Sequence, residues 1–138
     1  MILLATRGYL ILSALAFLWI GINTFRAPEH ALLGLEMVPT TVTALSEVRA
    51  NYGGMQMAIG LALLAGAAVS AARTPAIWLN LIITGGLVAG RLISWSLDGP
   101  PNSFGQILIG VELTGALVGI ALLQGWAARG RASRQDES

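Results

Sequence analysis

The segment Glu47-Val-Arg49-Ala-Asn51-Tyr52-Gly53-Gly54-Met55-Gln56 places two opposite charges, a carboxamide and a glycine pair at the start of a long apolar run. The sixteen-residue stretch 57–72 that follows contains no charged side chain. Charge beside such a run is costly in lipid unless it has partners. We therefore predict that the polar side chains of this segment pair with residues of later helices.

The composition predicts a membrane protein. Of the 138 residues, 55% are hydrophobic and only 11% are charged, whereas soluble domains carry about 25% charged residues. The length corresponds to one domain. The formal net charge of +1 gives no reason to expect nucleic acid as a partner.

The side-chain inventory excludes several kinds of chemistry. The sequence has no cysteine, its eight basic residues are all arginine, and His30 is its one histidine. Thiol nucleophiles, lysine Schiff bases, bis-histidine haem and a Ser-His-Asp triad are thereby excluded. We expect no metal and no cofactor. His30, beside Glu29, is either a proton relay or plain surface.

Four apolar segments approach the length of about 20 residues that a bilayer core requires. They predict an all-α integral membrane four-helix bundle over residues 1–128, with spans at about 6–25, 46–70, 76–97 and 104–128. The connection between the first two spans should contain a surface-lying or re-entrant turn. We expect the polar C-terminal tail, residues 129–138, to be disordered.

The basic residues predict the orientation, because cytoplasmic loops are enriched in arginine. With four spans, most arginines lie on one side of the membrane, namely Arg7, Arg73, Arg129, Arg131 and Arg134. Both termini should therefore be cytoplasmic, in a multi-pass protein of the cell inner membrane. The first apolar segment has no cleavage site of the small-x-small type before Arg26, so we expect it to be a retained span.

Counting outward from the two short hairpins predicts which polar residues lie at the same depth. Gln56 falls level with Arg91, and Arg91 falls level with Glu112. Arg49 falls level with Asp98, two helical turns nearer the outer surface. Residues seven apart share a helix face, so we predict a ladder with one rung at Arg49 and Asp98 and a deeper rung at Arg91.

This polar cluster has two interpretations. It either fixes how the helices pack or forms an outward-facing binding site. Its members are Arg49, Tyr52, Gln56, Arg91, Ser94, Asp98 and Glu112. Tyr52 either hydrogen-bonds into the ladder or anchors the chain at the membrane interface. Glu47 either caps its helix or meets the turn after Asp98.

Small residues indicate close helix packing in lipid. Gly86-x-x-x-Gly90 and Gly115-x-x-x-Gly119 have the spacing that allows helix backbones to approach. Each motif predicts a contact either inside the bundle or with another subunit.

The order of these motifs resembles a known family. Glu47-x-Arg49-x-x-Tyr52-Gly-Gly, then Gly90-Arg91-x-x-Ser94-x-x-x-Asp98-Gly, then Glu112, is similar to a small bacterial four-span membrane family classed as a domain of unknown function, number 4345. The similarity covers roughly residues 8–126. It implies four spans and a role for the charged residues, and it implies no activity.

Three functions follow as hypotheses. The first is a non-catalytic helix bundle that acts as an oligomer or as an accessory subunit of a larger membrane complex. The alternative is a protein that binds or transports a small anionic or amphipathic ligand in an outward-facing pocket at Arg49, Arg91 and Glu112. An intramembrane enzyme that uses Glu112 is disfavoured, because a neighbouring arginine keeps a carboxylate charged.

Overall fold

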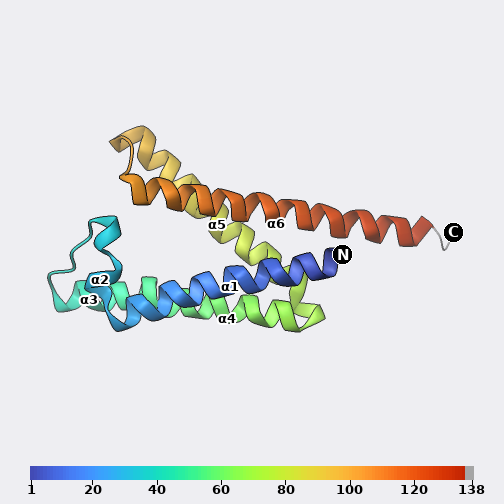
Figure 1. Cartoon of the computed structure of the whole chain (residues 1–138), viewed down its shortest axis with the longest axis horizontal. Coiled ribbons are helices and arrows are strands. Elements are labelled where there is room, and N and C mark those ends of the chain that lie inside the picture. Colours follow the sequence, from blue (N-terminus) through green and yellow to red (C-terminus); the bar gives the residue numbers. More distant parts are fainter. Residues whose placement is uncertain (136–138) are drawn as a thin grey trace.

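The computed structural model describes the backbone of residues 1–135 and the side chains of residues 1–129. That backbone is helical and contains no strand (Figure 1). In chain order the elements are α1 (Ile2–Arg26), α2 (Pro28–Ala31), the 3₁₀ turn η1 (Leu33–Leu35), α3 (Val42–Val48), the π-helical segment η2 (Arg49–Gly54), α4 (Met55–Ala68), α5 (Ser70–Asp98) and α6 (Ser103–Gln135).

Three of these helices are long and apolar enough to cross a membrane, which indicates a membrane protein. They are α1, α5 and the part of α6 from Ser103 to Arg129. A further helical run extends without interruption from α3 through η2 into α4. Its π-helical part divides it into shorter elements.

Local chemistry sets where the helices begin and end. The Thr41 hydroxyl accepts a hydrogen bond from the Ala44 amide and caps α3, as an N-cap threonine should. The Asn102 side chain caps α6 in the same way through the Gly105 amide. Gly99 ends α5 with a φ of +97°, a conformation that glycine adopts readily.

The helix bounds differ most from the predicted spans at two places. The third predicted span begins at residue 76, whereas α5 begins at Ser70 and contains Pro75. Pro75 removes one backbone hydrogen bond from this first part of α5. The contact of the next residue, Ala76, with Gly66 nevertheless holds the helix against α4. Most of the predicted disordered tail is also helical, because α6 continues to Gln135; residues 136–138 lie outside the described part.

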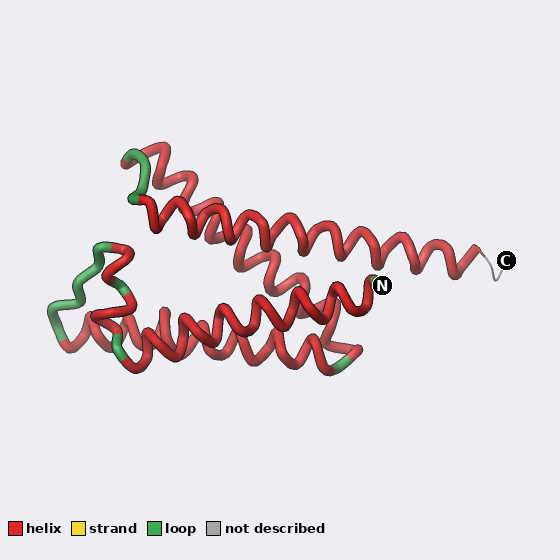
Figure 2. The backbone as a smooth tube through the Cα atoms, viewed as in Figure 1, coloured by secondary structure: helices red, strands yellow, loops and turns green. Residues whose placement is uncertain are grey.

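The helices form two pairs. The antiparallel helices α1 and α4 pack through glycines: a Cβ added at Gly21 would lie 2.8 Å from the Gly53 carbonyl oxygen, and one at Gly60 would lie 3.0 Å from that of Ala14. The helices α5 and α6 form the second pair. The first loop and the α5–α6 turn lie at one end of the molecule, called here the loop end (Figure 2).

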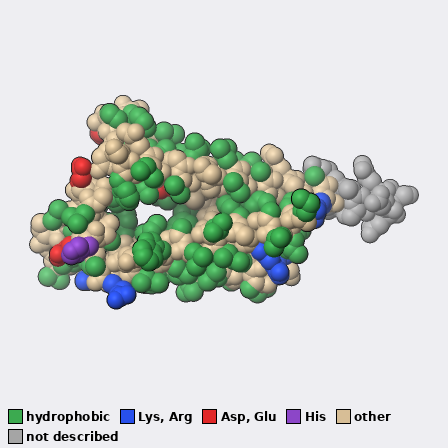
Figure 3. Space-filling view, viewed as in Figure 1, with side chains coloured by type: hydrophobic (Ala, Val, Ile, Leu, Met, Phe, Trp, Pro, Cys, Tyr) green, Lys and Arg blue, Asp and Glu red, His purple; other side chains and the backbone are tan. Residues whose placement is uncertain are grey.

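The two pairs meet at the opposite end. Their shared core contains Tyr9, Leu10, Ala14, Phe17, Leu63, Ala67, Ala76, Ile77 and Leu122. From this core α5 runs away from α1 and α4 towards the loop end (Figure 1). The surface is hollowed between the two pairs near the loop end, and hydrophobic side chains surround much of this hollow (Figure 3).

Candidate functional site

An ion pair joins α5 to α6. The Arg91 Nε donates to Glu112 Oε2 at 2.9 Å, and Arg91 Nη2 donates to Glu112 Oε1 at 3.0 Å. The side chains are 28% and 11% exposed, respectively. Two parallel hydrogen bonds between a guanidinium and a carboxylate form a strong, directional contact. The predicted pairing of Arg91 with Glu112 is confirmed.

The α5–α6 hairpin positions this pair. Val88, one turn deeper than Arg91 on α5, and Ile109, one turn nearer the α5–α6 turn than Glu112 on α6, are both buried. Further along, a Cβ added at Gly115 would lie 3.8 Å from the Thr84 methyl group. These small and branched side chains bring the two helices close enough for a bidentate contact.

The predicted outer rung, Arg49 with Asp98, is wrong. The Arg49 Nε donates instead to the Phe25 carbonyl oxygen at the end of α1, at 3.2 Å. The Asp98 carboxylate accepts a hydrogen bond from Ser94, one turn earlier on α5, at 3.0 Å. The two residues belong to helix pairs that diverge towards the loop end (Figure 1).

The π-helical segment explains the failed prediction for Arg49 and Gln56. Counting by sevens assumes α-helical geometry, but Arg49–Gly54 is a π-helix, which has more residues per turn. Gln56 is therefore turned relative to Arg49. Its Oε1 atom is buried without a hydrogen-bond partner, and none of the described hydrogen bonds joins it to Arg91.

The remaining polar residues of the opening segment have local roles. Tyr52 is 38% exposed, and its hydroxyl makes no hydrogen bond within residues 1–129. Glu47 neither caps a helix nor meets the turn after Asp98. Its backbone carbonyl and its carboxylate both accept hydrogen bonds from the Asn51 amide, at 3.1 and 3.0 Å.

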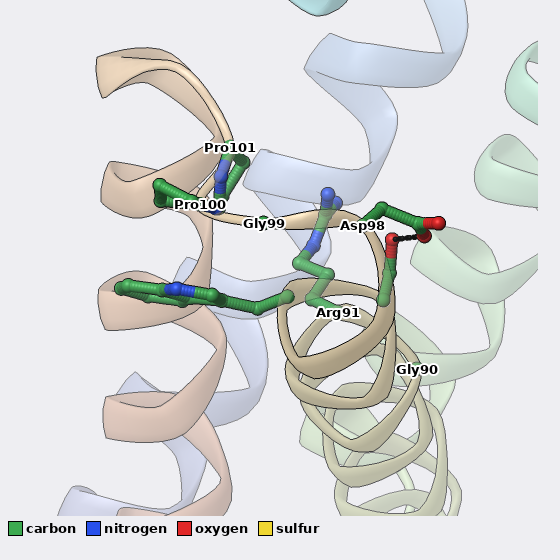
Figure 4. Close-up of a pocket in the computed structure, with 8 residues that line it drawn as sticks. Gly90, Arg91, Asp98, Gly99, Pro100 and Pro101 are labelled. Carbon is green, nitrogen blue, oxygen red and sulfur yellow. Dashed lines mark hydrogen bonds between the residues drawn. The ribbon is translucent and has the colours of Figure 1, made fainter.

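A pocket of about 410 Å³ lies beside the ion pair. Its lining comes from the last turns of α5 and from the following turn: Gly90, Arg91, Ser94, Trp95, Asp98, Gly99, Pro100 and Pro101. Figure 4 shows Arg91 and Asp98 beside the turn that contains Gly99, Pro100 and Pro101. The pocket thus brings together three of the predicted site residues, Arg91, Ser94 and Asp98.

Both charges in this pocket retain hydrogen-bonding capacity. Arg91 uses Nε and Nη2 for Glu112, which leaves Nη1 without a partner among the described side chains. One oxygen of Asp98 accepts from Ser94, and its other oxygen has no described partner. The pocket can therefore both donate hydrogen bonds to a ligand and accept them from it.

Three polar contacts between helices were not predicted from the sequence. The Tyr9 hydroxyl donates to the Gly115 carbonyl at 2.9 Å, and Asn80 donates to the Ser13 hydroxyl at 2.9 Å. The Trp126 indole donates to the Thr6 hydroxyl at 3.0 Å. Tyr9 itself is 9% exposed. These contacts join α1 to α5 and α6 at the end opposite the loops.

Asn102 joins the two pairs at the loop end. Its amide nitrogen donates to the Gly34 carbonyl at 3.1 Å and to the Glu36 carboxylate at 3.0 Å. A Cβ added at Gly34 would lie 2.9 Å from the Phe104 ring, so this turn packs directly on α6. We call this contact the loop latch. An asparagine after two prolines marks a helix start, but nothing in the sequence indicates its partner.

The two glycine motifs differ in their surroundings. Gly115 and Gly119 face neighbouring helices: added Cβ atoms would meet Thr84 of α5 and Tyr9 of α1, respectively. Added Cβ atoms at Gly86 and Gly90 would meet nothing within 4 Å. Of the two, the motif of Gly115 and Gly119 therefore packs against other helices within the described residues, and the motif of Gly86 and Gly90 does not.

Comparison with known families covers nearly the whole chain. The sequence profile described as Domain of unknown function (DUF4345) matches residues 5–129, a range that includes the ion pair and the pocket. No curated protein and no solved structure matches the chain. The match over residues 5–129 identifies the chain as a member of the family DUF4345, in agreement with the resemblance carried by its charged and glycine motifs.

Proposed function

We propose that this protein is a non-catalytic, multi-pass protein of a bacterial inner membrane that binds an amphipathic ligand in the pocket at Arg91, Ser94 and Asp98. Besides α1, α5 and α6, a four-span protein needs one more span, the second in chain order. We assign it to the helical run from α3 to α4, whose part from Arg49 onward has about the 20 residues that a bilayer core needs. The arginine distribution orients both termini to the cytoplasm. The pocket then faces the outer side.

The observation that supports ligand binding is the position of the pocket beside a charge pair. A volume of about 410 Å³ is within the range of small-molecule sites, about 300 to 1,000 Å³. If the cluster only fixed helix packing, its charged groups would be expected to satisfy one another. Arg91 and Asp98 instead keep free hydrogen-bonding positions at the pocket.

The charges favour an amphipathic ligand over a simple anion. Arg91 is compensated by Glu112, and Asp98 adds a negative charge to the same lining. A small anion would meet repulsion from Asp98 that Arg91 alone must overcome. Both Glu112 oxygens accept hydrogen bonds from Arg91, so this carboxylate orients the guanidinium.

The test uses two serines on α5. Ser94 lines the pocket and Ser96 does not, and both are exposed. The variants Ser94→Leu and Ser96→Leu add the same apolar volume to the same helix. We expect native mass spectrometry of the purified protein to show a bound amphiphile in wild type and Ser96→Leu, and its loss in Ser94→Leu. Equal occupancy in all three proteins would refute the proposal.

A second function, association as an oligomer or as an accessory subunit, is supported by a different face of α6. A shallow depression is lined by Ile107, Gly110, Val111 and Thr114. A Cβ added at Gly110 would meet nothing within 4 Å, and the Thr114 hydroxyl is bonded to the Gly110 carbonyl. Small residues four apart allow another helix to approach closely in lipid.

Size measurements in detergent test this second function. Gly110→Leu fills the depression, and Gly8→Leu is its control, because Gly8 also has open space around it. We expect a smaller native mass for Gly110→Leu than for wild type and Gly8→Leu. A mass that stays the same in all three would exclude association through this face.

A further inference from the structure

The pocket carries opposite charges in a fixed order along α5. Arg91 and Asp98 lie seven residues apart on one helix, which corresponds to about 10 Å along its axis. Asp98 is the last residue of the helix, beside the turn, and Arg91 lies two turns deeper. Both line the same pocket. A ligand that satisfies both must therefore be cationic at its outer end and anionic nearer the membrane.

The second observation is the hollow between the two helix pairs. The space between the two helix pairs is hollowed near the loop end and bordered largely by hydrophobic side chains (Figure 3). At membrane depth an apolar hollow excludes water, which lacks polar partners there. The apolar molecules available to fill such a space in a bilayer are lipid chains.

From these two observations we propose that the ligand is a zwitterionic glycerophospholipid of the phosphatidylethanolamine type. Its acyl chain enters the hollow, its phosphodiester accepts hydrogen bonds from Arg91 Nη1, and its ammonium group donates to the free Asp98 oxygen. Phosphate and amine then follow the order of Arg91 and Asp98 along α5. This inference rests on the proposed function, because it assigns a ligand class to the same pocket.

The charges distinguish this lipid from an anionic one. Phosphatidylglycerol carries the same phosphodiester but has an uncharged glycerol in place of the ammonium group. Next to Asp98 that glycerol leaves the carboxylate without a cation. The ammonium group adds Coulomb attraction to its hydrogen bond with the carboxylate, which we expect to give a preference of about tenfold.

The experiment compares the two lipids on three proteins. Delipidated wild type, Asp98→Asn and Glu29→Gln are titrated with phosphatidylethanolamine and phosphatidylglycerol of identical acyl chains, and binding is measured by native mass spectrometry. Asp98 is exposed and its one described partner is Ser94, so its amide variant should fold. Glu29 is an exposed acid of the first loop, and its variant removes the same charge elsewhere.

We expect wild type and Glu29→Gln to bind phosphatidylethanolamine about tenfold more tightly, and Asp98→Asn to bind both lipids equally. Equal affinities in wild type, or a preference that survives in Asp98→Asn, would overturn the zwitterion assignment. Ser94→Leu is measured alongside to separate the two proposals. If Ser94→Leu binds each lipid as tightly as wild type does, the pocket is not the binding site and the proposed function fails as well.

Discussion

Arg91 of α5 and Glu112 of α6 are joined by two parallel hydrogen bonds of 2.9 and 3.0 Å, with the carboxylate 11% exposed. Inside a bilayer such a pair avoids the cost of an isolated charge. It also fixes the relative register of two helices whose other contacts are small and apolar. The pair is therefore both a packing element and one wall of the pocket.

Removing one member of this pair should destabilise the protein more than removing both. Glu112→Leu leaves the Arg91 charge without its partner, and we expect the free energy of unfolding to fall by about 2 to 3 kcal/mol. This is below the 3–5 kcal/mol typical of a fully buried pair, because Arg91 is 28% exposed. Denaturation in detergent, followed by circular dichroism, measures the loss.

The double variant Arg91→Met with Glu112→Leu provides the comparison. An apolar pair of similar volume leaves no charge to compensate, so we expect it to recover most of the lost stability. A double variant as unstable as Glu112→Leu would mean that the helices need the ion pair itself.

Tyr9 should contribute through its hydroxyl. Tyr9→Phe keeps the ring in the core but removes the hydrogen bond to the Gly115 carbonyl. We expect a loss of about 0.5 to 1.5 kcal/mol, the usual net value of one hydrogen bond. Tyr52→Phe is the matched control, because Tyr52 is 38% exposed and should show no change. Denaturation in detergent, followed by circular dichroism, measures both variants. Equal effects of the two changes would contradict the stabilising role of the Tyr9 hydroxyl.

Alanine should have opposite effects at two glycines. A Cβ at Gly21 would lie 2.8 Å from the Gly53 carbonyl oxygen and the Met57 amide nitrogen, and helix backbones cannot shift locally. We expect Gly21→Ala to cost about 1 to 3 kcal/mol. A Cβ at Gly85 meets nothing, so Gly85→Ala should stabilise α5 by about 0.5 to 1 kcal/mol. Thermal unfolding of the two variants tests the signs.

Asn102→Asp separates the two roles of this residue. The carboxylate can still cap α6 through the Gly105 amide, but it has no donor for Gly34 and it repels Glu36. We expect the backbone hydrogen-exchange rate of the first loop to rise about five- to thirtyfold. This corresponds to a decrease of about one or two kcal/mol in the free energy of opening the loop. Exchange within α6 should stay unchanged.

Asn51→Asp is the control for the loop latch. Asn51 also donates to a carbonyl and to a glutamate, but both belong to Glu47 one turn away. This variant should leave the exchange of the first loop as it is in wild type. Faster exchange in both variants would point to a general effect of the added charge.

The helices and the deep ion pair could be predicted from the sequence for separate reasons. The apolar segments around residues 6–25 and 104–128 are long enough to be helical in lipid whatever their neighbours. Arg91 and Glu112 are separated by one short turn, so counting from its centre places them at the same depth. Local chemistry and hairpin symmetry suffice for both predictions.

The pairing of Arg49 with Asp98 failed because it depended on geometry that counting does not contain. It required Arg49 to follow α-helical periodicity and α5 to stay beside α4. The segment from Arg49 to Gly54 is π-helical, and α5 diverges towards the loop end (Figure 1). Arg49 thus reaches the end of α1 and donates to the Phe25 carbonyl.

The sequence by itself determined that the chain is helical, that it suits a membrane, and that Arg91 and Glu112 meet. These properties depend on apolar length and on distances along the chain. The tertiary structure alone decided that the helices form two diverging pairs, that Asn102 holds the first loop, and that a pocket lies beside Arg91. The two pairs and the contact of Asn102 arise between segments distant in the chain, and the pocket depends on how the turn after Asp98 folds back beside α5; no local pattern encodes either.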